Sequence, residues 1–87
     1  MTFRKHLNEL LKNEEFKMAY EDERRLLELG FAVAQAREQR GMTQKELAQQ
    51  CRVTQQQLSK IENGINCNLL TFIKVSSALG LELTVTA

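Results

Sequence analysis

The 87-residue sequence predicts an all-α fold: a helix-turn-helix bundle of about five helices, an additional N-terminal helix and a short C-terminal β-strand. Apolar residues recur at three- and four-residue spacing along most of the chain, which is the period of a helix. Gly41, Gly64 and Gly80 each follow such a segment, where a left-handed residue commonly ends a helix. With 43% hydrophobic residues, the chain can form one small core.

The N-terminal third predicts amphipathic helices in front of the bundle. Residues 2–12 present apolar side chains on one helical face. Asn13 can cap a further helix whose first turn holds two glutamates, which suit the positive end of the helix dipole. The charged run at residues 21–25 is either a solvated face or a short break between helices. Gly30, inside a helical pattern, indicates a bend or a close contact with another helix.

Helices are then expected at short intervals, over residues 31–40, 43–51, 54–63 and 69–79. Two of them open with the same pattern, T-Q-K-E from Thr43 and T-Q-Q-Q from Thr54. Both match the capping box, in which a threonine and a glutamate or glutamine three residues later satisfy each other's backbone amides. Asn68 is a plausible cap for the last helix.

The helices at 43–51 and 54–63 are expected to form a helix-turn-helix. Only Arg52 and Val53 separate the two, with Val53 available to fill the corner, so the helices must cross steeply. Their spacing turns one face of each toward the core. The expected inward residues are Leu47, Ala48, Cys51, Leu58 and Ile61.

The outer face of the second of these helices is a candidate DNA-reading surface, because it carries long amides, a hydroxyl and a lysine but no acid. Glutamine can bond adenine N6 and N7, and lysine can reach guanine or a phosphate. Side chains at the start of the preceding helix lie where amides meet the DNA backbone. The alternative is a plain polar surface, since Gln49 and Gln50 show that the chain uses glutamine freely. The expected DNA contacts are Thr43, Gln44, Arg52, Thr54, Gln55, Gln56, Gln57, Ser59, Lys60 and Asn63.

The last seven residues change period. Leu81, Leu83 and Val85 alternate with polar residues, which predicts a strand with one buried face. A single strand cannot satisfy its own backbone groups, so it must pair with another molecule or fray. This pattern predicts a dimer or partner contact through residues 81–87.

The motif R-x-x-R-G-M-T-Q-K-E-L-A at residues 37–48, followed by V-T-Q-x-x-L-S-K-I-E-N-G at 53–64, resembles the Xre (phage-repressor) helix-turn-helix family. The resemblance implies a structural ion pair between Arg37 and Glu62. It also implies DNA contacts from Gln44, Gln55, Gln56 and Lys60. Two positions depart from the family pattern. Arg52 stands where the turn glycine is usual and is expected to be left-handed, costing on the order of 1 kcal/mol. Cys67 stands where proline is common.

The flanking segments resemble HigA-type antitoxins of toxin–antitoxin operons. The resemblance rests on L-x-x-L-L-K-N-E-E-F-K-x-A-Y at residues 7–20 and L-G-L-E-L-T-V at 79–85. It implies an antitoxin that neutralises a small RelE- or HigB-like messenger-RNA-cleaving toxin and represses its own operon. The expected organisation is a partner-binding segment at 1–30, a DNA-binding domain at 31–80 and a pairing strand at 81–87. The expected toxin contacts are Phe3, Leu7, Leu10, Leu11, Phe16 and Tyr20.

Composition bears on the remaining classes of function. The net charge is only +1, so one copy should bind DNA weakly, and a homodimer on a palindromic operator is expected. Cys51, Cys67 and His6 lack metal-ligand spacing, and no nucleophile–base pair is evident, so neither a cofactor nor enzyme activity is expected. No apolar run suits a membrane span or signal peptide, which favours a cytoplasmic protein. A stand-alone Xre-family transcriptional repressor is the main alternative to an antitoxin.

Overall fold

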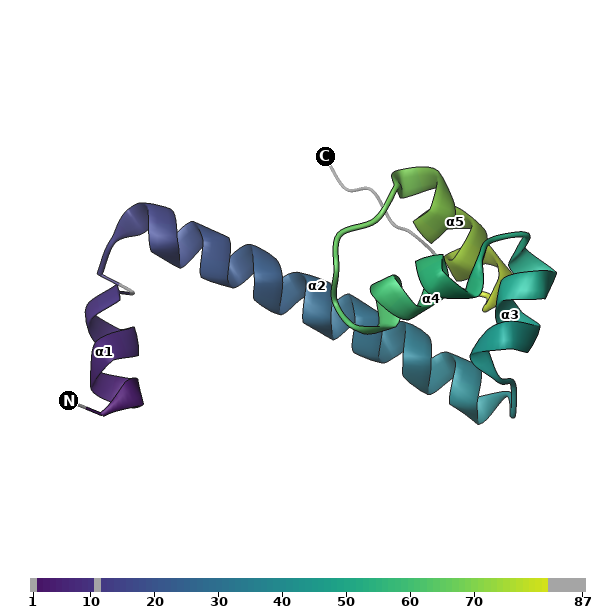
Figure 1. Cartoon of the computed structure of the whole chain (residues 1–87), viewed down its shortest axis with the longest axis horizontal. Helices are drawn as coiled ribbons and strands as arrows, with labels where there is room; N and C mark the ends of the chain where they lie inside the picture. Colours follow the sequence, from purple (N-terminus) through teal and green to yellow (C-terminus); the bar gives the residue numbers. More distant parts are fainter. Residues whose placement is uncertain (1, 11, 82–87) are drawn as a thin grey trace.

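The computed structural model describes residues 2–10 and 12–81, which form five helices (Figure 1). Each interhelical connection is short, as in other compact helical bundles. Three of the helices, α3, α4 and α5, gather around the C-terminal half of the long α2. The helices are α1 (Phe3–Leu10), α2 (Glu14–Gln39), α3 (Gln44–Cys51), α4 (Gln55–Glu62) and α5 (Leu69–Ala78).

The helix α2 is continuous over 26 residues and begins at the cap predicted for it. The side chain of Asn13 accepts a hydrogen bond from the N–H of Phe16 at 3.1 Å. The charged run at 21–25 is a solvated face, where Arg24 bonds Glu21 and Glu28 along the helix. The predicted separate helix at 31–40 is therefore the second half of α2.

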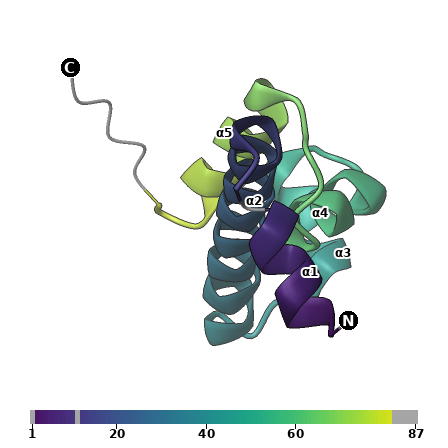
Figure 2. The same cartoon turned by 90° about the vertical axis from the view of Figure 1, so that its left-hand side faces the viewer.

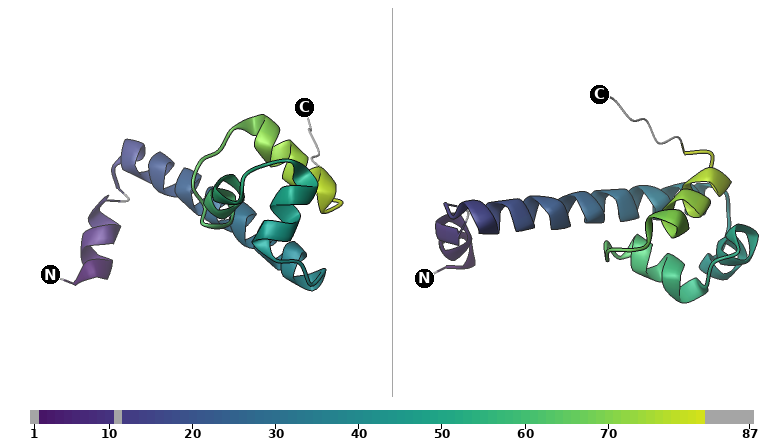
Figure 3. Two further views of the ribbon diagram at one scale, coloured as in Figure 1. Left: turned by 45° about the vertical axis from the view of Figure 1, so that its right-hand side comes forward. Right: turned by 90° about the horizontal axis from the view of Figure 1, so that it is seen from above.

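The N-terminal helix α1 lies outside the bundle. It stands at the end of α2 that is farthest from α3, α4 and α5 (Figures 1 and 3), and it crosses α2 instead of running along it (Figure 2). None of its eight residues is buried. The bundle therefore obtains its core from the other four helices.

The core contains every residue that the helical spacing had turned inward on α3 and α4. Val33, Leu47, Leu58 and Val75 are fully buried at its centre. Val53 packs against it at the corner of the turn, as predicted. Side chains of this size stabilise a fold by roughly 1.5–3 kcal/mol each when fully buried. The remaining buried hydrophobic residues are Ala48, Cys51, Ile61 and Leu79.

Gly30 marks a close helix contact and not a bend. A Cβ atom at this position would lie 2.3 Å from the backbone oxygen of Ile61 and 3.0 Å from that of Glu62. The absence of a side chain thus lets the end of α4 rest directly on the backbone of α2. This contact sets the position of α4 on the bundle.

The prediction of a C-terminal strand is wrong for the part of the chain that the structure describes, since residues 2–10 and 12–81 contain helices and no strand. Leu81 belongs to the end of α5: its N–H donates to the oxygen of Ser76 at 2.9 Å, after a left-handed Gly80. This bond satisfies a carbonyl that the helix end leaves open. Leu83 and Val85 lie outside the described residues. No helix within the described ranges combines the length and apolar character needed to cross a membrane.

Candidate nucleic-acid interface

Both helices of the helix-turn-helix begin at the capping boxes that the sequence predicted. In α3, the N–H of Glu46 donates to Thr43 Oγ1 and the N–H of Thr43 donates to Glu46 Oε1, each at 3.1 Å. In α4, Gln57 and Thr54 make the same reciprocal pair at 3.0 and 2.9 Å. The boxes fix the first turn of each helix and aim its remaining backbone N–H groups outward.

The turn between α3 and α4 depends on a left-handed arginine. Arg52 has φ 61° and ψ 41°, and it is the one described non-glycine residue with positive φ. This backbone lets the N–H of Val53 donate to the oxygen of Ala48 at 3.0 Å, which closes α3. Arg52 thus takes the conformation expected for a residue in place of the turn glycine, and its side chain remains exposed beside α4.

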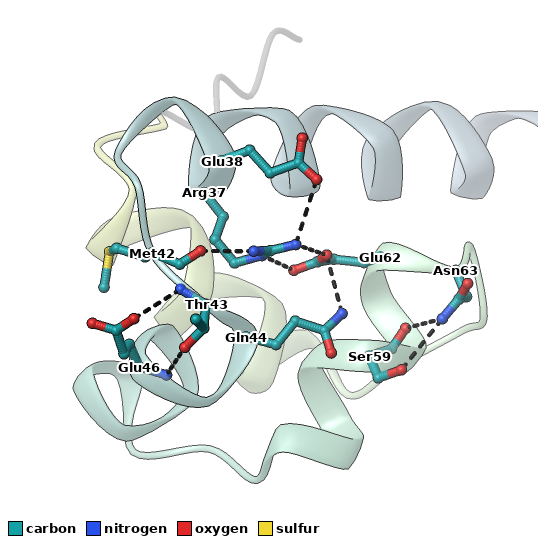
Figure 4. A network of polar contacts seen from close by, with 9 residues as sticks. All are labelled: Arg37, Glu38, Met42, Thr43, Gln44, Glu46, Ser59, Glu62 and Asn63. Atoms are coloured by element: carbon teal, nitrogen blue, oxygen red, sulfur yellow. Dashed lines mark hydrogen bonds and ion pairs between the residues drawn. The ribbon is translucent and has the colours of Figure 1, made fainter.

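One carboxylate joins three elements of the interface (Figure 4). Glu62, at the end of α4, accepts hydrogen bonds from Arg37 Nε at 2.8 Å and Arg37 Nη2 at 2.9 Å. It also accepts one from Gln44 Nε2 at 3.2 Å. Arg37 donates further to the oxygen of Met42 at 2.7 Å, in the loop before α3. The bidentate geometry is the strong form of an arginine–carboxylate pair.

This ion pair is largely shielded from solvent, with 13% of the Arg37 side chain and 6% of the Glu62 side chain exposed. The hydrogen bonds that Arg37 donates to Glu62 raise the pKa of Arg37, and burial opposes that shift. Both groups therefore serve the scaffold: they hold the start of α3 against the end of α4.

The outer face of α4 carries the candidate reading groups. Gln55, Gln56 and Lys60 are exposed along it. Asn63 Nδ2 is turned back along the helix, donating to the oxygen of Ser59 at 2.8 Å and to Ser59 Oγ at 3.3 Å. The start and middle of this face therefore carry exposed amides and an ammonium group. At its end, Asn63 and Ser59 are hydrogen-bonded to each other.

Several other predicted DNA contacts also make hydrogen bonds within the domain. Gln57 Oε1 is occupied by its capping bond, and Gln44 Nε2 is held by Glu62. The hydroxyl oxygens of Thr43 and Thr54 accept capping bonds, which leaves each hydroxyl hydrogen to donate elsewhere. These side chains can still reach a phosphate, but only from positions that the scaffold fixes.

The charge near the interface favours an anion. Hydrogen bonds from Thr43, first from its backbone and then from its side chain, hold the pKa of Glu46 below its ordinary value. Glu46 and Glu62 are thus both bonded within the domain, while Arg52 and Lys60 are exposed. The N-terminal ends of α3 and α4 add partial positive charge.

The residues predicted to bind a partner lie far from this face. Phe3 is 81% exposed on α1, and Leu7 and Leu10 are partly buried there. Phe16 and Tyr20 lie on the first half of α2, with ring centroids 6.5 Å apart. Leu11 lies outside the described residues. The two predicted surfaces therefore occupy opposite ends of α2 (Figure 1).

Arg40 has a role that the sequence pattern did not predict. Its guanidinium donates to the oxygen of Ala78 at 2.9 Å and to that of Leu79 at 2.6 Å. It thereby connects the end of α2 to the end of α5, where a cation also suits the helix dipole. The sequence offered one signal, an arginine in the last turn of a helix, but nothing to indicate which carbonyls it would reach.

Comparison with known proteins agrees with this geometry. A profile of the helix-turn-helix family matches residues 33–85. A solved chain from the "Structure of HipA-HipB-O2-O3 complex" is 35% identical, with a TM-score of 0.63, and the match covers 71% of this chain and 89% of that one. No curated protein matches the sequence significantly. Because the family profile spans more than half of the chain, the chain belongs to the Xre-type helix-turn-helix family.

Proposed function

We propose that this protein binds a specific DNA sequence by inserting α4 into the major groove. The observation that carries the proposal is the exposed row of Gln55, Gln56 and Lys60, presented by a helix whose ends are fixed by a capping box and a buried ion pair. A rigidly held helix can place amides within reach of base edges, where glutamine bonds adenine and lysine bonds guanine. Arg52 and the N-terminal ends of the helices supply contacts to phosphates.

The proposal is tested by selecting tight-binding duplexes from a randomised DNA pool with the full chain. The wild type should enrich one sequence, and Gln55→Ala or Gln56→Ala should relax the selection at individual positions. Gln49→Ala is the matched control, because it removes an exposed glutamine from α3. Failure of the wild-type chain to enrich any sequence would remove the support for base reading by α4.

We further propose that the chain is an antitoxin that represses its own operon as a homodimer on a palindromic site. Support comes from α1, an amphipathic helix without a buried residue that lies apart from the bundle (Figure 1) and carries Phe3, Leu7 and Leu10. The resemblance of residues 7–20 to HigA-type antitoxins favours a RelE- or HigB-like toxin. The solved relative comes from a complex that contains HipA and HipB, which favours a HipA-like partner instead.

Co-expression with the adjacent reading frame separates these alternatives. An antitoxin should co-purify with the neighbouring product through α1, and Phe3→Asp should abolish that association while leaving DNA binding intact. Messenger-RNA cleavage by the released partner identifies a RelE- or HigB-like toxin, and its absence favours the HipA-like class. A chain that represses its promoter and retains no neighbouring product is the stand-alone regulator.

A further inference from the structure

The helix α2 carries an exposed apolar stripe that the DNA-binding function leaves without a role. It consists of Phe16, Tyr20, Leu27 and Phe31, which fall within an arc of about 60° at 3.6 residues per turn. Leu27 is 56% exposed and Phe31 67% exposed. Tyr20 is exposed and Phe16 is half-buried, and about 10 Å of helix separates this pair from Leu27 and Phe31. Exposed apolar side chains gathered on one face of a charged helix commonly mark an interaction surface.

The two halves of the stripe differ in shape. Phe16 and Tyr20 lie near the start of α2, in the half of the helix that extends beyond the bundle (Figure 3). The other half forms the floor of a shallow groove of about 540 Å³ between α2 and the end of α4. Its lining residues are Arg24, Leu27, Glu28, Phe31, Ala34 and Glu62. The stripe thus offers a pair of aromatic rings at one end and an apolar groove at the other.

The spacing of the stripe is the same when read in either direction from a midpoint between Glu23 and Arg24. A two-fold axis at that midpoint, perpendicular to α2, would place Phe16 opposite Phe31 of a second copy. The same axis would place Tyr20 opposite Leu27 of that copy. Each aromatic pair would then enter the groove of the other chain, which is the self-complementary arrangement that a two-fold dimer requires.

The charges on one edge of the stripe fit the same arrangement. Lys17, Glu21, Arg24 and Glu28 alternate in sign along that edge. In the antiparallel pair that the stripe defines, Lys17 lies about 3 Å along the axis from the level of Glu28 of the second copy, and Glu21 lies as far from the level of its Arg24, an offset that these long side chains can span. In a parallel two-fold pair this edge would instead face the other edge of the partner's stripe, where Glu23 is the charged residue, and the alternating signs would have no match. Exposed ion pairs contribute little stability, so the apolar stripe would drive association and the charges would select its direction.

We propose that two copies of this chain pair through antiparallel α2 helices, with the Phe16–Tyr20 pair of each copy in the Leu27–Phe31 groove of the other. The pairing supplies a surface for the homodimer of the proposed function. Because Phe16 and Tyr20 are also predicted toxin contacts, a second copy and a toxin compete for them. Tests of this pairing use the chain alone, without DNA or toxin, so their failure is distinct from failure of the proposed function.

Charge reversal along the edge tests the direction of pairing. Lys17→Glu/Arg24→Glu makes the edge wholly acidic, and Glu21→Lys/Glu28→Lys makes it wholly basic. Each variant alone should form a dimer at least about ten-fold weaker than wild type by sedimentation equilibrium, and an equimolar mixture should restore the dimer. Circular dichroism verifies that each variant keeps its helices. The proposal is overturned if either double-substituted chain, measured alone, dimerises with wild-type affinity. It is also overturned if the mixture of the two does not restore the dimer.

Engineered cysteines test the register, in a Cys67→Ser background. Tyr20→Cys and Leu27→Cys chains should form a disulfide-linked dimer when mixed, because those positions face each other across the two-fold axis. Each chain alone should remain unlinked, since equivalent positions lie about 10 Å apart along the paired helices at 1.5 Å per residue. Linkage of either chain with itself, or none in the mixture, contradicts antiparallel pairing.

A substitution at Glu23 should strengthen the dimer instead of weakening it. It lies on the other edge of the stripe, where the two-fold axis brings it beside Glu23 of the second copy. Glu23→Gln removes this repulsion and should tighten the dimer, an effect that misfolding cannot imitate. An unchanged or weaker dimer argues against an axis at this midpoint.

Discussion

Glu62 is the residue on which the geometry of the DNA-binding unit depends most. Its carboxylate, at the end of α4, accepts bonds from Arg37 of α2 and from Gln44 of α3. Removing it would leave the largely shielded charge of Arg37 with only the exposed carboxylate of Glu38, 3.8 Å away, and an ion pair that loses one partner costs more than one that was never formed. The carboxylate therefore holds the relative positions of three helices at once.

Glu62→Ala is expected to lower the free energy of unfolding by about 3 kcal/mol, measured by urea denaturation. The double substitution Arg37→Met/Glu62→Leu should recover most of that loss, because it removes both charges and keeps the volume filled. A loss below about 1 kcal/mol in the single variant would show that Arg37 is already solvated.

Glu46 gives the stability of the domain a component that depends on pH. Its pKa is lowered in the folded chain by hydrogen bonds from Thr43. The stabilisation is therefore fully present above the unfolded-state pKa and is lost as pH falls through the lower folded-state pKa. Glu46→Gln keeps a capping partner of the kind that Gln57 provides in α4, but does not titrate. In acid, urea midpoints should fall further for wild type than for Glu46→Gln; parallel profiles would contradict the assignment.

At the scale of the elements, the crossing of α2 and α4 is the contact that presents the reading helix. It depends on Gly30, where the backbone oxygen of Ile61 occupies the space of a side chain. A glycine inside a helix is ordinarily unfavourable by up to about 1 kcal/mol relative to alanine. The close approach of the two helices outweighs that cost.

Gly30→Ala should therefore destabilise the fold by about 1–3 kcal/mol despite the better helix propensity of alanine. Ala32→Gly is the matched control at an exposed position of the same helix, where glycine should be the worse residue. Thermal unfolding of both variants measures the sign of the change in stability that each substitution causes. A Gly30→Ala chain more stable than wild type would mean that α4 does not rest on α2 in this way.

The caps and turns could be predicted from the sequence because each depends on a few neighbouring residues. The boxes at Thr43 and Thr54 and the left-handed Arg52 all belong to this class. The continuity of α2 could not be predicted, since a run of charges suits a solvated helix and a break equally well. The alternation of apolar residues after Gly80 predicted a strand wrongly, because Gly80 and Leu81 complete the end of α5.

At the scale of the whole molecule, the DNA-binding unit and the N-terminal helix occupy opposite ends of α2 (Figure 1). Sequence periodicity predicted that α1 is amphipathic but not that it would stand apart. Whether an apolar face turns inward depends on the direction of the chain after residue 10, which no local pattern specifies. The long-range bond from Arg40 to the end of α5 escaped prediction for the same reason.

Deletion of residues 1–12 should change the free energy of unfolding of the bundle by less than about 0.5 kcal/mol, because α1 buries no residue. DNA affinity should be retained and association with a toxin lost. Urea denaturation and co-purification measure the two effects. A large loss of stability would place α1 within the fold of the domain and not in a separate binding segment.

Affinity for the selected duplex across a salt series decides whether α4 reads DNA. Gln55→Ala and Gln56→Ala should each weaken binding to that duplex by about 1–3 kcal/mol and leave binding to random DNA unchanged. Lys60→Ala should reduce the slope of log K against log salt by about 1, and Gln49→Ala should behave as wild type. Equal affinities for wild type, Gln55→Ala, Gln56→Ala and Lys60→Ala on the selected duplex would contradict the assignment of α4 as the reading helix.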